Sequence, residues 1–117
     1  MLYDINGKKT TYIPHEDDYQ RWMSELSQYE LDAVKKALND YCDTHESFVS
    51  GFIPGSNWGG TPFIPLYYAC KDNEQHAAWF FGLLLWTVIQ SRTDEWYFFR
   101  SEASDRGYTG LTYFRKK

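Results

Sequence analysis

The stretch from Ala77 to Ile89 constrains the fold of this chain more than any other part. Its sequence, AAWFFGLLLWTVI, places apolar side chains on every face of a helix, and a helix of that kind has to be surrounded by other groups. A membrane span needs about 20 apolar residues, so this stretch is too short to cross a bilayer. We therefore expect a helix over residues 74–91, capped by Asn73, at the centre of a protein core.

The length of the chain fits one domain with a large core. The chain has 117 residues, and single cores commonly extend to about 100–150 residues. Aromatic residues make up 20% of the chain, and large aromatic side chains are the ones that bury the most surface. Residues 1–117 are therefore expected to form a single globular domain. The first residues do not resemble a signal peptide, and Cys42 and Cys70 fit reduced, buried thiols, so we expect a cytoplasmic protein.

The residues before the glycine-rich segment predict a hairpin and helical structure. Tyr3–Ile5 and Lys9–Ile13 flank Asn6-Gly7, a dipeptide that favours a β-hairpin turn. The acidic residues 16–18 then begin an amphipathic helix. Ser27 and Glu30 have the spacing of a capping box, and a second apolar stripe follows them. The two stripes predict either two helices or one bent helix.

The middle of the chain predicts a loop and a short helix. Phe48–Thr61 contains four of the eight glycines together with Pro54, so we expect an irregular loop there. Thr61 and Pro62 are typical of a helix start, with threonine as the N-cap and proline at the first helical position. A short third helix should therefore extend from this point to Ala69, before the central helix begins.

The end of the chain predicts a second hairpin. Glu95–Ser101 is aromatic and strand-like, with Trp96 and Phe98 on one face and Tyr97 and Phe99 on the other. The return strand is expected at residues 111–115. The predicted fold is thus α+β, with about four helices around the central aromatic helix (74–91) and with N-terminal and C-terminal β-hairpins.

From Gln28 onward this order of elements is similar to that of a winged helix, although no specific motif accompanies the layout. A winged-helix protein that binds DNA uses polar side chains of its recognition helix to reach base edges. The central helix offers Trp79, Phe80 and Phe81 instead. We therefore interpret this helix as a packing or dimerisation element, and Gly82, which permits close approach of another helix, favours a homodimer.

Charge and motif content favour a binding role over catalysis. The net charge is −4, with −5 over residues 1–46, −2 over 47–99 and +3 over 100–117, and this balance argues against a general nucleic-acid binder. The three histidines are not accompanied by a nucleophile motif. The leading hypothesis is a non-catalytic cytoplasmic interaction or regulatory protein that binds a protein partner through an acidic helical face, formed by Asp17, Asp18, Asp32, Asp40 and Asp43.

The alternative hypothesis is a winged-helix-like regulator that binds nucleic acid through the basic C-terminal hairpin. Arginine and lysine bind phosphates, and aromatic rings between them stack on bases. The candidate residues for this role are Arg100, Arg106, Tyr108, Arg115, Lys116 and Lys117.

Two further patterns carry weaker hypotheses. Gly59, Gly60 and Thr61 precede a predicted helix start and are a candidate anion site, but the loop lacks the lysine of a P-loop. Two cysteines and two histidines could hold a zinc ion, although their spacing matches no standard zinc motif. These four residues are Cys42, His45, Cys70 and His76. The sequence predicts neither a bound metal nor a cofactor.

Overall fold

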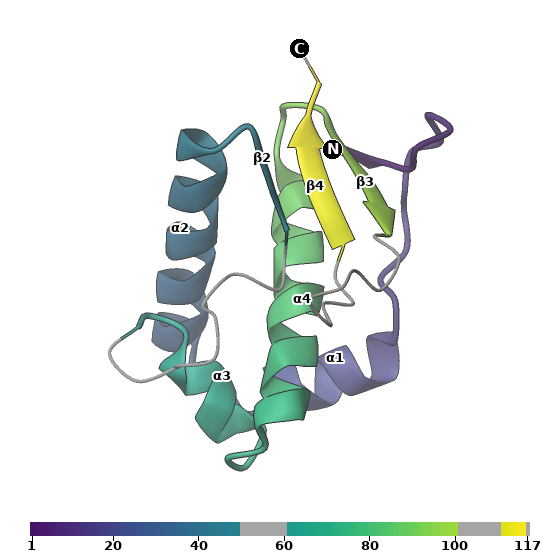
Figure 1. The fold of residues 1–117 in the computed structure, drawn as a ribbon. Helices are drawn as coiled ribbons and strands as arrows, with labels where there is room; N and C mark the ends of the chain where they lie inside the picture. Colours follow the sequence, from purple (N-terminus) through teal and green to yellow (C-terminus); the bar gives the residue numbers. More distant parts are fainter. Residues whose placement is uncertain (50–60, 101–110, 117) are drawn as a thin grey trace, which may run out of the picture.

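The computed structural model describes residues 1–49, 61–100 and 111–116 of the chain (Figure 1). These residues form an α+β fold in which the helix α4 lies behind a sheet and other helices pack around it (Figure 1). In chain order the elements are β1 (Leu2–Tyr3), α1 (Glu16–Met23), α2 (Gln28–Thr44), β2 (Ser47–Val49), α3 (Ile64–Ala69), α4 (Glu74–Ser91), β3 (Trp96–Arg100) and β4 (Leu111–Arg115).

The central helix α4 has the bounds that the sequence predicts. The side chain of Asn73 accepts a hydrogen bond from the backbone N–H of His76 at 3.0 Å and so caps its first turn. The helices α1, α2 and α3 and the strand β1 all contact α4. These contacts bury most of its apolar residues, namely Ala77, Phe80, Phe81, Leu83, Leu84, Leu85, Trp86, Val88 and Ile89.

One stripe of α4 remains uncovered in this single chain. Gln75, Ala78 and Trp79 are exposed, and Gly82 lies half-buried next to them. A Cβ atom added to Gly82 would meet no heavy atom within 4 Å. No packing within the described part of the chain therefore requires a glycine at this position.

The two amphipathic stripes near the N-terminus form two separate helices. Ser27 ends the connection between them, and its side chain accepts a hydrogen bond from the N–H of Glu30 at 3.1 Å. The Glu30 carboxylate accepts one in return from the N–H of Ser27 at 3.0 Å, which completes the predicted capping box. Tyr19 and Trp22 of α1 and Val34, Leu38 and Cys42 of α2 are buried.

The sheet joins strands from the two ends of the chain and from its middle. Its order is β1-β3-β4-β2, with β1 parallel to β3 and the two other pairs antiparallel. The predicted C-terminal hairpin is confirmed as β3 and β4. The strand β2 lies where the sequence analysis predicts an irregular loop. Three residues are too few to show an alternating pattern, so β2 is defined by its pairing with β4.

The N-terminal segment turns as predicted but pairs differently. Gly7 has a φ of 86°, and its N–H donates to the carbonyl oxygen of Asp4 at 2.9 Å. The expected return strand is reduced to one antiparallel bridge between Tyr3 and Lys9. The main partner of β1 is β3, because Leu2 opposite the buried Trp96 extends the core.

The third helix begins later than the sequence predicts. The hydroxyl of Thr61 accepts a hydrogen bond from the N–H of Phe63 at 3.2 Å, so it caps a turn, and α3 starts at Ile64. After α3 the chain reverses through Lys71 and Asp72, whose φ angles are 56° and 60°. Both residues therefore adopt the left-handed conformation that favours glycine.

Candidate functional site

The two faces of the sheet have different surroundings. Trp96 and Phe98 of β3 point toward α4, and Trp96 is fully buried. The ring of Phe98 lies 4.8 Å from that of Trp86 on α4, measured between centroids. Tyr97 and Phe99 lie on the opposite face, where Phe99 is 40% exposed. The helices pack behind the sheet in Figure 1, so this second face looks away from α4.

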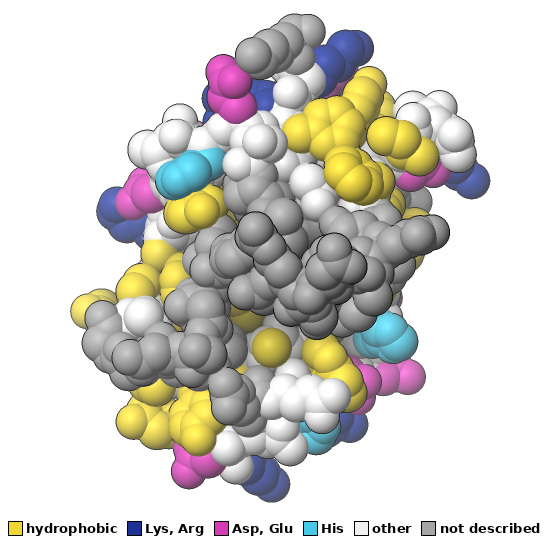
Figure 2. Space-filling view, in the orientation of Figure 1, with side chains coloured by type: hydrophobic (Ala, Val, Ile, Leu, Met, Phe, Trp, Pro, Cys, Tyr) yellow, Lys and Arg dark blue, Asp and Glu magenta, His cyan; other side chains and the backbone are white. Residues whose placement is uncertain are grey.

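Four rings form a connected apolar surface on that second face. The centroid distances are 5.6 Å between Tyr3 and Tyr97, 5.5 Å between Tyr97 and Phe114, and 6.0 Å between Phe99 and Phe114. We call these four residues the outer aromatic face. Figure 2 shows hydrophobic side chains gathered over the upper ends of β3 and β4. The rings come from three adjacent strands, and their mutual contacts hold them in place.

The two basic residues of the predicted nucleic-acid site whose side chains are described, Arg115 and Lys116, each lie close to a carboxylate of the same chain. Arg115 lies on the inner side of the sheet, with its guanidinium 5.0 Å from the ring centroid of Trp96, and its Nε is 3.5 Å from the carboxylate of Asp94. The ammonium of Lys116 is 3.3 Å from the carboxylate of Glu95. The structure gives no side-chain description of Arg100, and Arg106, Tyr108 and Lys117 lie outside the described residues.

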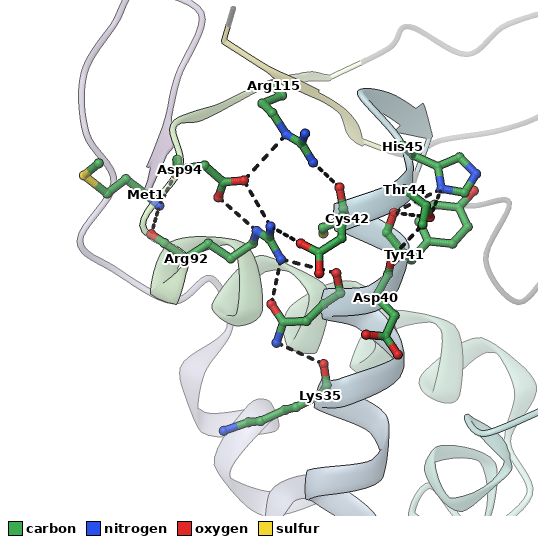
Figure 3. Close-up of polar contacts among 12 residues, drawn as sticks. Met1, Lys35, Asp40, Tyr41, Cys42, Thr44, His45, Arg92, Asp94 and Arg115 are labelled. Atoms are coloured by element: carbon green, nitrogen blue, oxygen red, sulfur yellow. Dashed lines mark hydrogen bonds and ion pairs between the residues drawn. The ribbon is translucent and has the colours of Figure 1, made fainter.

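A cluster of polar side chains joins the ends of α2, α4 and β3 (Figure 3). Arg92 follows α4 directly and donates two hydrogen bonds to the Asp94 carboxylate at 2.9 and 3.0 Å. It donates two more to the backbone oxygen and the side-chain oxygen of Asn39, and a fifth to the carboxylate of Asp43 at 2.6 Å. All five N–H groups of the guanidinium thus have an acceptor. Arg92 therefore joins these elements and has no N–H left for a ligand.

The same cluster holds Met1 and the last residue of β4, Arg115. The amino group of Met1 donates to the carbonyl oxygens of Ile89 and Asp94 at 3.1 and 2.9 Å, so a cation lies at the C-terminal end of α4, where the helix dipole favours it. Burial lowers the pKa of this amino group, although Asp94 acts to raise it. Arg115 donates to the backbone oxygen of Cys42 (Figure 3).

The charges of the cluster shift one another's pKa. The hydrogen bond from Arg92 to Asp94 raises the pKa of the Arg92 guanidinium, against the opposing effect of burial. Burial by itself would raise the pKa of the Asp94 carboxyl. Hydrogen bonds from Arg92 and Trp96 outweigh that effect, so the pKa of Asp94 lies below its usual value. Both groups are therefore charged at neutral pH.

The five carboxylates of the predicted acidic face are divided between α1 and α2, which lie on different sides of α4 (Figure 1). Four of them have partners within the chain, at distances of 2.6 to 2.8 Å. The pairs are Asp18 with Arg21, Asp32 with Gln28, Asp40 with Lys36 and Asp43 with Arg92. Asp17 is exposed in the first turn of α1. The structure therefore does not gather these residues into one acidic surface.

The remaining predicted sites are only partly described. Gly59 and Gly60 lie outside the described residues, and Thr61 has the capping role given above. Cys42 and Cys70 are free and buried, and burial raises the pKa of each thiol to about 11. Within residues 1–49, 61–100 and 111–116, no three histidine, cysteine or acidic side chains are close enough together to hold a metal ion.

Neither the outer aromatic face nor the role of Arg92 is among the features predicted from the sequence. The alternation of Tyr97 and Phe99 with Trp96 indicated that β3 has two apolar faces, and this was the available signal. For Arg92 the sequence offered no comparable signal, because its partners Asn39 and Asp43 lie about fifty positions earlier in the chain.

Comparisons with known proteins identify no relative of this chain. No family model, no curated protein and no solved structure matches this chain. No helix in the described part of the chain is both long enough and apolar enough to be a membrane span.

Proposed function

We propose that this protein has a non-catalytic role and recognises a partner protein through the outer aromatic face. The observation that carries the proposal is the connected set of four rings on the side of the sheet that faces away from α4. Aromatic side chains are enriched at protein interfaces, and they contribute most of the binding energy where they lie near the centre of a contact.

The charges around this face favour a protein over a nucleic acid. Lys116 and Arg115 are each close to a carboxylate, so these two described cations at the end of β4 already have partners of opposite charge. A nucleic acid needs unpaired cations for its phosphates, whereas an uncharged protein surface needs none. We therefore expect the partner to present an apolar, uncharged surface to the rings, with polar contacts around Lys116 and Glu95.

The acidic helices are less suited to be the main contact. Asp18, Asp40 and Asp43 have basic partners within the chain, which reduces the field that a basic protein would encounter. We therefore propose that the partner protein contacts the sheet and not α1 and α2.

Photo-crosslinking followed by affinity measurement tests the proposal. A photoreactive phenylalanine analogue in place of Phe99 is expected to crosslink a protein in cells of the source organism, and the same analogue in place of Tyr29 is not. Tyr29 is a matched control because it is an exposed aromatic residue at the start of α2, far from β3 and β4 in Figure 1. The crosslinked protein is then purified for binding measurements.

Phe99→Ser and Tyr97→Ser are expected to weaken binding of that purified protein by at least about tenfold, whereas Tyr29→Ser leaves it unchanged. Thermal melting of each variant checks that it is folded. The proposal fails if the three variants bind equally well, if the analogue at position 29 crosslinks as efficiently, or if the crosslinked molecule is a nucleic acid. Recovery of a second copy of this chain alone would replace the partner protein with a homodimer.

A further inference from the structure

A groove of about 320 Å³ lies between α2 and α4, away from the outer aromatic face. Lys35 and Asn39 line it from α2, and residues of the last turns of α4 line it from the other side. The apolar side chains of Ile13 and Val88 form part of its wall. Given that a water molecule occupies roughly 30 Å³, the groove has room for about ten non-hydrogen atoms.

Two of the polar groups in the groove are wholly or partly occupied by contacts within the chain. The guanidinium of Arg92 uses all five N–H groups on Asn39, Asp43 and Asp94. The amide of Asn39 accepts from Arg92 through its oxygen and donates to the backbone oxygen of Lys35 through its nitrogen. A negatively charged ligand in the groove would therefore be bound by a cation other than Arg92.

Lys35 is the cation that remains for a ligand. Its side chain extends away from the Arg92 cluster in Figure 3. Among the residues that the structure describes, no carboxylate pairs with its ammonium, whereas the ammonium of the adjacent Lys36 lies 2.8 Å from the Asp40 carboxylate. The groove thus presents one unpaired positive charge.

The opposite side of the groove presents hydrogen-bond acceptors. The hydroxyl of Ser91 donates to the backbone oxygen of Thr87, and the hydroxyl of Thr87 donates to the backbone oxygen of Leu84, both at 2.9 Å. The amide nitrogen of Gln90 donates both its protons, to Thr10 and Tyr12. The lone pairs of Ser91 Oγ and the side-chain oxygen of Gln90 therefore face no donor within the described part of the chain.

We propose that this groove binds a small organic carboxylate that carries hydroxyl groups. The carboxylate contacts the ammonium of Lys35, the ligand hydroxyl groups donate to Ser91 and Gln90, and the hydrocarbon part packs on Ile13 and Val88. A ligand that carries an ammonium group in place of the hydroxyl groups is less suitable. The uncharged oxygens of Ser91 and Gln90 do not compensate for removing the ammonium from water. This site is independent of the proposed protein contact on the sheet.

A titration followed by ¹H–¹⁵N NMR tests the proposal. The probes are the sodium salts of hydroxybutyrate, lactate and glycerate at constant ionic strength, and butyrate is the matched probe without a hydroxyl group. At least one hydroxy acid is expected to give saturable shift changes at the amides of Thr87, Gln90 and Ser91. Lys35→Gln is expected to weaken this binding about tenfold, and Lys36→Gln, which removes the same charge from the adjacent residue, to change it less than about twofold.

Ser91→Ala is expected to lower the affinity for the hydroxy acid toward that for butyrate. The proposal is overturned if none of the hydroxy acids gives saturable changes at the groove, or if Lys35→Gln and Lys36→Gln weaken binding equally. Equal affinity of the wild-type protein for hydroxybutyrate and butyrate would overturn the role of the hydroxyl groups. Lys35 and Ser91 are exposed, so these variants are expected to fold, which the same spectra verify.

Discussion

Replacement of Arg92 by glutamine should destabilise the protein far more than replacement of an exposed arginine. The Arg92 side chain is 14% exposed, and it joins α4 to α2 and β3. Asp43 is 61% exposed, so its pairing contributes only about 0.5 kcal/mol. The bonds to Asp94 and Asn39 are better shielded, and a hydrogen bond to a charged group contributes roughly 1.5–3 kcal/mol. Since bonds within one network do not add fully, we expect a total loss of about 2–3 kcal/mol.

Urea unfolding followed by circular dichroism measures this loss, with Arg21→Gln as the matched control. Arg21 pairs with Asp18 on the surface of α1, and its side chain is 64% exposed, so its loss should cost at most about 1 kcal/mol. The double variant Arg92→Gln/Asp94→Asn should be less destabilised than the sum of its single variants by about 1 kcal/mol. If Arg92→Gln and Arg21→Gln lower the free energy of unfolding equally, Arg92 does not stabilise the fold more than a surface arginine. If the losses of Arg92→Gln and Asp94→Asn add fully in the double variant, the two side chains do not stabilise the fold through their contact.

Three other predictions concern acid stability, the core and a turn. The folded-state pKa of Asp94 lies below the ordinary aspartate value of about 3.9, so its contribution to stability is complete above that value and is lost as the pH falls through the folded-state pKa. The difference in unfolding free energy between the wild type and Asp94→Asn should therefore be largest near neutral pH and shrink in acid, and a constant difference would contradict this. Leu84→Ala removes a fully buried side chain of α4 and should cost about 2–5 kcal/mol in urea unfolding, whereas a loss below about 1 kcal/mol would mean that this part of α4 is loosely packed. Lys71→Gly relieves a positive φ and should stabilise the protein by about 0.5 kcal/mol, seen as a higher melting temperature; a lower one would argue against the left-handed turn.

The elements that the sequence predicted well are those with strong local signals. The helix α4 has its predicted bounds because Asn73 caps it and because an unbroken apolar run follows. Ser27 and Glu30 separate α1 from α2 through contacts within four residues of each other. The strands β3 and β4 are five residues long and rich in aromatic residues, which favours strands in the sequence.

The elements that the sequence missed depend on distant partners. The strand β2 is defined by pairing with β4, and β1 prefers β3 to the hairpin return that Asn6-Gly7 suggests. The turn predicted at Gly7 is present. The pairing of β1 with β3, however, follows from the burial of Leu2 against Trp96. Arg115 and Asp43 were expected to face a partner, yet each is held by side chains that are far away in sequence.

The strand order has a consequence for how the protein forms during synthesis. Each of β1 and β2 pairs only with β3 or β4 in the described part of the chain, and β1 precedes β3 by more than ninety residues. The strand β1 can therefore pair only after residues 96–115 have emerged from the ribosome, while α1, α2 and α4 can form from local contacts. The sheet, and with it the outer aromatic face, is assembled last. A nascent chain whose α4 has emerged from the ribosome while residues 96–115 are still inside it should hence be helical and expose the apolar surface of α4 to chaperones.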